Sequence, residues 1–128
     1  MSESVHVGVT PMSDRYDSDD DRWQDAVADL VEDLRGETGA LHVVRTPVDG
    51  TKGSIDQLLL TLGSAGVFSA AIDALRIWLA RDKTRSIMLT YEDRDGMEQR
   101  LDVRATHADD QTLAPLVNAV ADRIAAGP

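Results

Sequence analysis

The sequence contains no cysteine. Disulfides, thiolate metal ligands and thiol nucleophiles are therefore excluded, and the absence fits a reducing compartment. The first residues, Met-Ser-Glu-Ser, have neither a basic region nor an apolar core, so they do not predict a signal peptide. We expect a cytoplasmic protein.

Positive charge is scarce. The chain has 13 lysines and arginines against 23 aspartates and glutamates, a formal net charge of −10 over 128 residues. Non-specific binding to nucleic acid or to an anionic membrane needs basic surface, so this balance argues against both. The hydrophobic fraction of 42% and the charged fraction of 28% are those of an ordinary soluble protein. This length and composition predict one domain over residues 1–128.

A hydrophobic run long enough to span a membrane is also missing. The longest charge-free part runs from Gln57 to Ile72, whereas a spanning helix needs roughly 20 apolar residues. Any longer window includes Asp73 and Arg76, each of which costs a few kcal/mol on insertion. We expect no membrane insertion.

The most apolar stretch, 54–82, is predicted to be one long or broken helix. Ser54 and Gln57 fit a capping box at its start. Its apolar residues wrap most of the circumference, and a helix that is apolar all round must be buried all round. In a small chain this predicts self-association or a partner, with these interface candidates: Leu59, Gly63, Gly66, Phe68, Leu75 and Trp78. The glycines at 63 and 66 indicate either a break in the helix or a close approach of another backbone.

The remaining patterns surround this stretch. Apolar alternation predicts strands at 3–10, which Pro11 ends, and at 40–46, and helical spacing predicts an amphipathic helix at 22–35. Residues 85–105 are predicted to be a hairpin that turns at Asp95-Gly96, and residues 112–126 a third helix. The order β-α-β-α-β-β-α predicts an α/β (α+β) two-layer sandwich. We expect a mixed four-stranded sheet with a parallel pair and all helices on one face, because the hairpin's other face is charged.

No catalytic set is visible. His6 and His42 are expected on neighbouring strands of the exposed sheet face, but neither they nor His107 have a nucleophile or carboxylate at the spacing of a triad or metal site. The acidic loop at 12–21 begins like a calcium-binding loop, yet Arg22 stands where the turn glycine belongs. We therefore expect no catalytic residue, metal or cofactor.

One loop has a weak likeness to an anion site. Lys52, Gly53 and Ser54 lie just before the predicted long helix, and backbone N–H groups at a helix start can hold an anion. The spacing of a Walker A motif is absent, because no glycine directly precedes the lysine. Capping of the helix explains the same residues.

Short motifs from the long apolar stretch onward resemble a known family. They are Leu62-Gly63-Ser64-Ala65-Gly66, then Ala74-Leu75-Arg76-Ile77-Trp78-Leu79, and finally the hairpin turn with Leu101-Asp102-Val103 after it. Together they make residues 22–125 similar to the effector-associated constant component family. These are small bacterial proteins, common in actinobacteria, encoded beside effector modules of NTP-dependent biological conflict systems. The resemblance implies a non-enzymatic partner protein in a defence-like system and supplies no catalytic residues.

Two functions from different classes follow. The favoured one is an interaction or adaptor component that self-associates or docks an effector protein through the long apolar helix. The alternative is a small-ligand or phosphate-binding protein, or an enzyme, that uses the loop at 50–54.

Overall fold

The computed structural model describes residues 5–16, 20–38, 41–47, 54–62, 64–92 and 95–125. The strands within these ranges are β1 (Val5–Ser13), β2 (Leu41–Pro47), β3 (Ser54–Leu62), β4 (Arg85–Glu92) and β5 (Glu98–Arg104). The helices are α1 (Asp21–Thr38), α2 (Ala65–Ala80) and α3 (Asp110–Ala125), with a short 3-10 turn, η1 (Ala105–His107), before α3.

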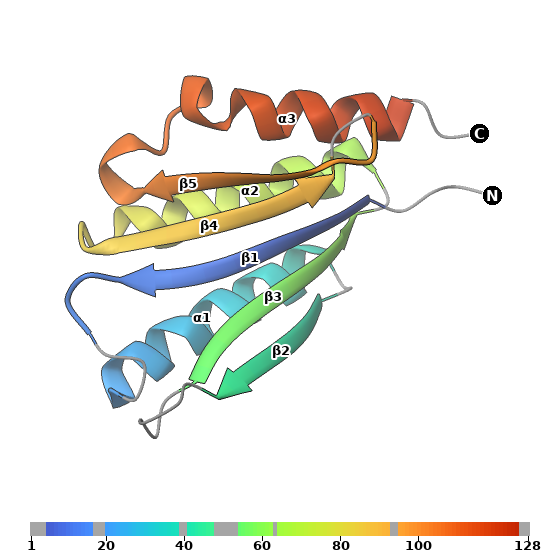
Figure 1. Ribbon diagram of the computed structural model, residues 1–128. Helices are drawn as coiled ribbons and strands as arrows, with labels where there is room; N and C mark the ends of the chain where they lie inside the picture. The colour runs from blue at the N-terminus through green and yellow to red at the C-terminus, as the bar shows by residue number, and fades with distance from the viewer. Residues whose placement is uncertain are drawn as a thin grey trace.

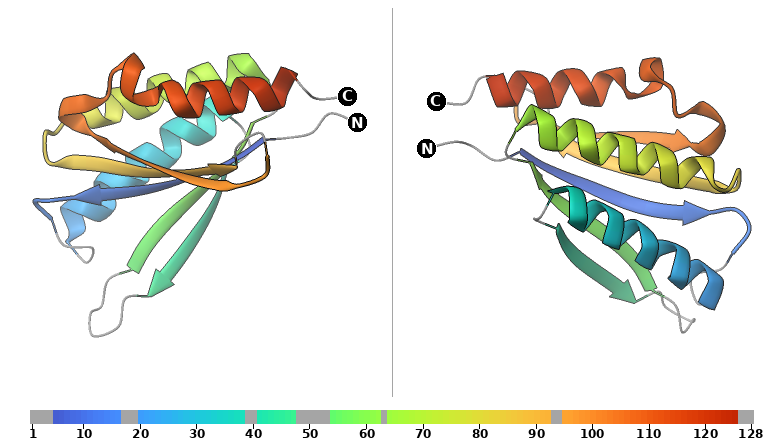
Figure 2. Two further views of the ribbon diagram at one scale, coloured as in Figure 1. Left: turned by 45° about the horizontal axis from the view of Figure 1, so that its top comes forward. Right: turned by 180° about the vertical axis from the view of Figure 1, so that it is seen from behind.

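The strands form one sheet in the order β2-β3-β1-β4-β5, and every neighbouring pair is antiparallel. The described helices all lie on the same face of this sheet (Figures 1 and 2). The fold is therefore a two-layer α+β sandwich, and the prediction of helices on one face is confirmed. The first described strand, β1, lies in the centre of the sheet, and the later strands lie on both sides of it.

The predicted mixed sheet of four strands is wrong. Along the described residues the order is β-α-β-β-α-β-β-α, and β1 is separated from β2 by β3, which pairs with both. The expected parallel pair therefore does not exist. The missing strand is the first part of the segment that we predicted to be a helix.

The long apolar helix at 54–82 is likewise wrong. Its first nine residues are β3, and α2 starts only at Ala65. In β3, Leu58, Leu60 and Leu62 are buried in the core, whereas Leu59 lies half-buried on the other face. A strand with leucines on both faces gives a continuous apolar run, which periodicity cannot distinguish from a buried helix. Neither alternative for the glycines is observed: no helix directly precedes α2 that could be broken, Gly66 has no other backbone close to it, and Gly63 lies outside the described residues.

The other predicted elements are confirmed with small shifts. The helix at 22–35, the strand at 40–46, the hairpin at 85–105 and the helix at 112–126 correspond to α1, β2, β4–β5 and α3. The hairpin turn contains Gly96 with a positive φ of 81°.

The first strand does not end at Pro11 as predicted, because β1 continues to Ser13. Along the described residues, β1 pairs with β3 from Val5 to Val9, while its pairing with β4 runs on through Pro11. Figure 2 shows β2 and β3 swinging away from β1. A proline is tolerated where one side of a strand has no partner, since its missing N–H removes no ladder bond there.

Asp20, at the end of the acidic loop, caps the start of α1. Its carboxylate accepts hydrogen bonds from the backbone N–H of Arg22 at 2.9 Å and from the Arg22 guanidinium. The side-chain bond and then the backbone bond to Arg22 lower the pKa of Asp20 below its ordinary value. Residues 17–19 of the loop lie outside the described residues.

The core is centred on Trp78 of α2, whose side chain is fully buried. Its indole N–H donates to the carbonyl of Ala26 in α1 at 2.9 Å, and its ring lies 5.9 Å from that of Trp23. The guanidinium of Arg85, at the start of β4, stands 4.5 Å above the Trp78 ring and donates to the Trp78 carbonyl at 2.8 Å. One side chain thus ties α1, α2 and β4 together.

Replacing Trp78 by Phe tests this centre. We expect Trp78→Phe to lower the free energy of unfolding by about 2 kcal/mol, because it removes a buried hydrogen bond and leaves a gap. Ile77→Ala, one residue earlier and 57% exposed, is the matched control and should stay within about 0.5 kcal/mol. Urea unfolding followed by circular dichroism measures both. Equal losses would show that Trp78 has no special role.

The start of α2 gives a second test. The Ser64 hydroxyl accepts from the backbone N–H of Val67 at 3.2 Å, so Ser64, and not Ser54, caps a helix. Ser64→Ala should lower the free energy of unfolding by about 1 kcal/mol, the usual cost of losing an N-cap. Ser69→Ala, on the exposed side of the same helix, removes a hydroxyl without removing a cap. It should not destabilise the chain in the same unfolding measurement.

Candidate functional site

The sheet face opposite the helices, here called the outer face, is not covered by any element within the described residues (Figure 2). Strand alternation decides which side chains reach it. Val7 and Val9 of β1 point into the core, so Gly8 points outward, and the register places Gly8 beside Leu59 on β3 and Thr90 on β4. A single row across the whole sheet therefore reads His42, Leu59, Gly8, Thr90, Arg100.

The middle of the outer face is free of charge. We call this the central patch, formed by Gly8, Thr10, Leu59, Met88 and Thr90, from the three inner strands. All five are buried or half-buried although no described element covers them. Charged residues follow on one side, along the edge strand: Glu98, Arg100, Asp102 and Arg104.

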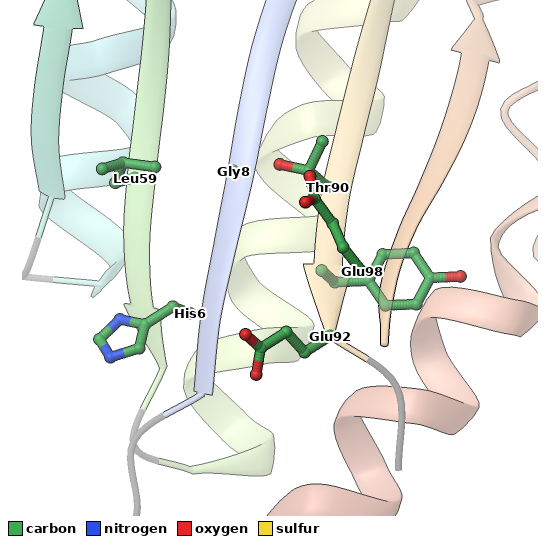
Figure 3. A pocket seen from close by; sticks show the side chains of 7 residues that line it. His6, Gly8, Leu59, Thr90, Glu92 and Glu98 are labelled. Carbon is green, nitrogen blue, oxygen red and sulfur yellow. The ribbon is translucent and has the colours of Figure 1, made fainter. Parts of the chain in front are cut away.

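A hollow opens in this face next to Gly8 (Figure 3). We call it the Gly8 hollow. It has a volume of about 240 Å³ and these lining residues: His6, Gly8, Leu59, Thr90, Tyr91, Glu92 and Glu98. Four strands contribute to it, so it exists only in the assembled sheet.

Gly8 is one of the lining residues of the hollow, and side chains from neighbouring strands lie close above it. A Cβ atom at this position would collide with the Thr90 hydroxyl and would lie 2.9 Å from the side-chain nitrogen of Gln57. Neighbouring side chains therefore lean over the glycine from β4 and β3. A residue with a side chain does not fit here unless these neighbours move.

The walls of the hollow are acidic. Glu92 ends β4 and pairs directly with Glu98, which begins β5. Figure 3 shows the Glu92 carboxylate on the side of His6 and the Glu98 carboxylate beside Thr90. The His6 imidazole lies 3.3 Å from the hydroxyl of Thr61, and it is exposed.

This arrangement suits a cation or a hydrogen-bond donor. Two carboxylates offer acceptors, and an anion would meet repulsion. Among the described residues, no group of three or more metal-ligating side chains is placed to hold a metal ion.

The predicted interface candidates do not form one surface. Phe68, Leu75 and Trp78 are 7%, 3% and 0% exposed and belong to the core, where the helices and the sheet of the same chain cover them. Leu59 lies on the outer face, and Gly66 is exposed in the first turn of α2. Gly63 lies outside the described residues.

The other predicted site residues are also separated. Ser54 begins β3, so the helix start that suggested an anion site is absent there, and Lys52 and Gly53 lie outside the described residues. His6 and His42 share the outer face, but β3 stands between their strands, roughly 10 Å apart. The two histidines are therefore not on neighbouring strands, contrary to the prediction.

Among the described residues, no helix has both the length and the apolar character that crossing a membrane requires.

Sequence reasoning missed Gly8, Thr90, Glu92 and Glu98 as members of one site. One signal was available, since a glycine inside an alternating strand often marks a close approach of another group. The partners of that glycine depend on strand order, and the predicted order lacked β3.

These features define a small two-layer α+β protein with an open sheet face and an acidic hollow in it. Within that class, the model of the family Effector Associated Constant Component 1 matches residues 17–121. The chain belongs to this family, which confirms the resemblance seen in its motifs. Comparison with curated proteins and with solved structures gives no match.

Adding a methyl group at Gly8 tests the close contact between this position and Thr90. Gly8→Ala should lower the free energy of unfolding by about 1–3 kcal/mol, as expected for an overpacked site. Shortening the neighbour in Gly8→Ala/Thr90→Ala should recover part of this loss, which thermal unfolding of the two single variants and the double variant would reveal. Additive effects would contradict the contact between these two positions.

Proposed function

We propose that this chain is a non-enzymatic, effector-associated component of a bacterial conflict system and that it docks a partner protein on the outer face of its sheet. The family supports the association with an effector. The location of the docking surface is argued from the outer face alone, because the long apolar helix that first suggested a surface is not present.

The observation that carries this proposal is the direction of Leu59 and Met88. Both are large apolar side chains on the face away from the core, and both are only half-buried. Beside them runs the charged edge strand β5. An uncharged centre with a charged rim is the usual arrangement of a protein–protein interface, where methionine is enriched at the centre.

The helical face is a weaker candidate for the docking surface than the outer face. The apolar side chains of α2 are largely used in the core, and Ile77 is its one large hydrophobic residue that is described as exposed. On α3, Val117 is 38% exposed. Single exposed apolar residues are normal on a protein surface and need no partner.

The non-enzymatic part of the proposal is carried over from the sequence motifs, in which no catalytic set is visible. The alternative, a ligand-binding protein or enzyme that uses the loop at 50–54, stays a prediction. The helix start on which this alternative depended is absent, because Ser54 begins the strand β3.

The test measures docking of a candidate effector, taken as the product of a gene next to this chain's gene, which is where the family resemblance implies that an effector is encoded. Leu59→Glu should weaken binding by at least about tenfold in isothermal titration calorimetry, because it places a charge at the centre of the interface. Ile77→Glu makes the same chemical change on the helical face and should bind like the wild type. Circular dichroism confirms that both variants are folded.

Two results would contradict the docking surface. One is an equal loss of binding in Ile77→Glu, and the other is no loss in Leu59→Glu.

Self-association, which was also predicted, is checked by light scattering on the chain alone. A stable dimer that Leu59→Glu dissociates would make a second copy the occupant of the outer face.

A further inference from the structure

We propose that the strand β2 pairs with the β2 strand of a second copy of this chain, so that the two sheets join into one across a two-fold axis. The surface involved is the side of β2 that faces away from β3, here called the β2 edge. It is separate from the outer face, so this inference goes beyond the proposed function and does not depend on it.

The backbone of the β2 edge is available for pairing. All of β2, from Leu41 to Pro47, pairs with β3, and within the described part of the chain no strand lies on its other side. Figure 2 shows β2 at the border of the sheet, beyond α1. An edge of this kind presents a row of backbone N–H and C=O groups with which another strand can form a ladder.

The two edges of the sheet differ in their protection against such pairing. On β5 every residue of the outer face is charged and exposed: Glu98, Arg100, Asp102 and Arg104. Charged side chains on an edge strand hinder the addition of another strand. In β2 only one residue of seven is charged, and residues 38–48 contain no aspartate or glutamate although the chain has 23 of them. The β2 edge therefore lacks the protection that β5 has.

The apolar side chains of β2 are only partly covered by their own chain. Leu41 and Val43 point toward the helices, since their partners on β3 are core leucines. Both are half-buried, whereas Leu58 and Leu60 beside them are 0% and 2% exposed. Val44, on the outer face, is half-buried as well. A strand added at the β2 edge covers these side chains, and the burial of apolar surface favours its addition.

The helix next to this edge also presents no acidic residue to it. Figure 2 shows α1 between α2 and β2. Ala26 lies on the side of α1 toward α2, because its carbonyl accepts the hydrogen bond from Trp78. Helical spacing places the opposite flank of α1, toward β2, at these residues: Gln24, Ala28, Val31 and Arg35. The acidic side chains of α1 are thus directed elsewhere.

Charge and symmetry together identify a second copy as the occupant. A chain with a net charge of −10 repels its own copies over most of its surface, but β2 and the adjacent flank of α1 carry no acidic side chain that would oppose the approach. Antiparallel pairing is also self-complementary, because a two-fold axis near the middle of β2 sets the same row of donors and acceptors opposite itself. Leu41 and Val43 of the two copies then meet on the helix side of the joined sheet.

The first experiment measures the mass of the intact chain by light scattering coupled to size-exclusion chromatography. We expect twice the 13.9 kDa of one chain. Val43→Lys should give the mass of one chain, because its lysine reaches water past a free edge but is enclosed between two joined strands. Leu101→Lys is the matched control, since Leu101 is the half-buried, core-facing residue of the other edge strand. It should remain a dimer, and circular dichroism checks that both variants are folded.

A disulfide crosslink tests the same pairing without adding charge. The chain has no cysteine, so His42→Cys/Val44→Cys carries the only thiols. A two-fold axis at residue 42, 43 or 44 sets two of these thiols from different copies directly opposite each other, at a Cα separation that a disulfide spans. Mild oxidation should therefore give a linked dimer on a non-reducing gel. Arg100→Cys/Asp102→Cys, on the same face of β5, should stay unlinked.

Three results would overturn the inference: a wild type that is a monomer, a dimer that Val43→Lys leaves intact, or equal dissociation by Val43→Lys and Leu101→Lys. If Val43→Lys does not fold, the crosslink decides, and its absence or an equal yield from the β5 control overturns the pairing.

Effector docking separates this inference from the proposed function. Leu59→Glu changes the outer face and not the β2 edge, so it should abolish docking while the dimer persists. If the chain alone is a monomer and Val43→Lys weakens docking, the β2 edge receives a strand of the effector and the second copy is wrong. If the dimer forms as expected but no effector docks, the proposed function fails and this inference stands.

Discussion

The hydrogen bond from the Trp78 indole to the Ala26 carbonyl fixes how the two central helices meet. It is formed in the core between two helices, next to the tilted ring of Trp23, where a polar group without a partner would be costly. Arg85 covers the other side of the Trp78 ring and links it to β4. The helix layer and the sheet are thereby held in one relative position.

Placing all helices on one face has a consequence for the other. The strands present most of their large apolar residues to the helices, and the alternate residues of each strand lie on the outer face. In β1 these alternate residues include Gly8, and the antiparallel register brings Thr90 and Leu59 to either side of it. The hollow lies beside Gly8, close to the start of the charged edge strand.

Parts of the candidate site were within reach of sequence reasoning. The charged alternation of residues 98–104 indicated that one face of the hairpin is exposed, and the structure agrees. The apolar stretch led to the wrong surface, because Phe68 and Leu75 are core residues of a single chain. Glu92 and Glu98 are six residues apart in sequence, but His6 joins them only across two strand pairings, which no local pattern encodes.

The sequence by itself determined the elements whose periodicity is unambiguous: the amphipathic α1, the alternating hairpin and the C-terminal helix. It also determined the family, through short motifs around Trp78. Only the tertiary structure decided that 54–62 is a strand, since its leucines face the core on one side and a half-buried sheet face on the other. Inserting that strand between β1 and β2 changed the sheet from mixed to antiparallel. Burial on both faces removes the alternation by which a strand is recognised, so long-range pairing had to make that choice.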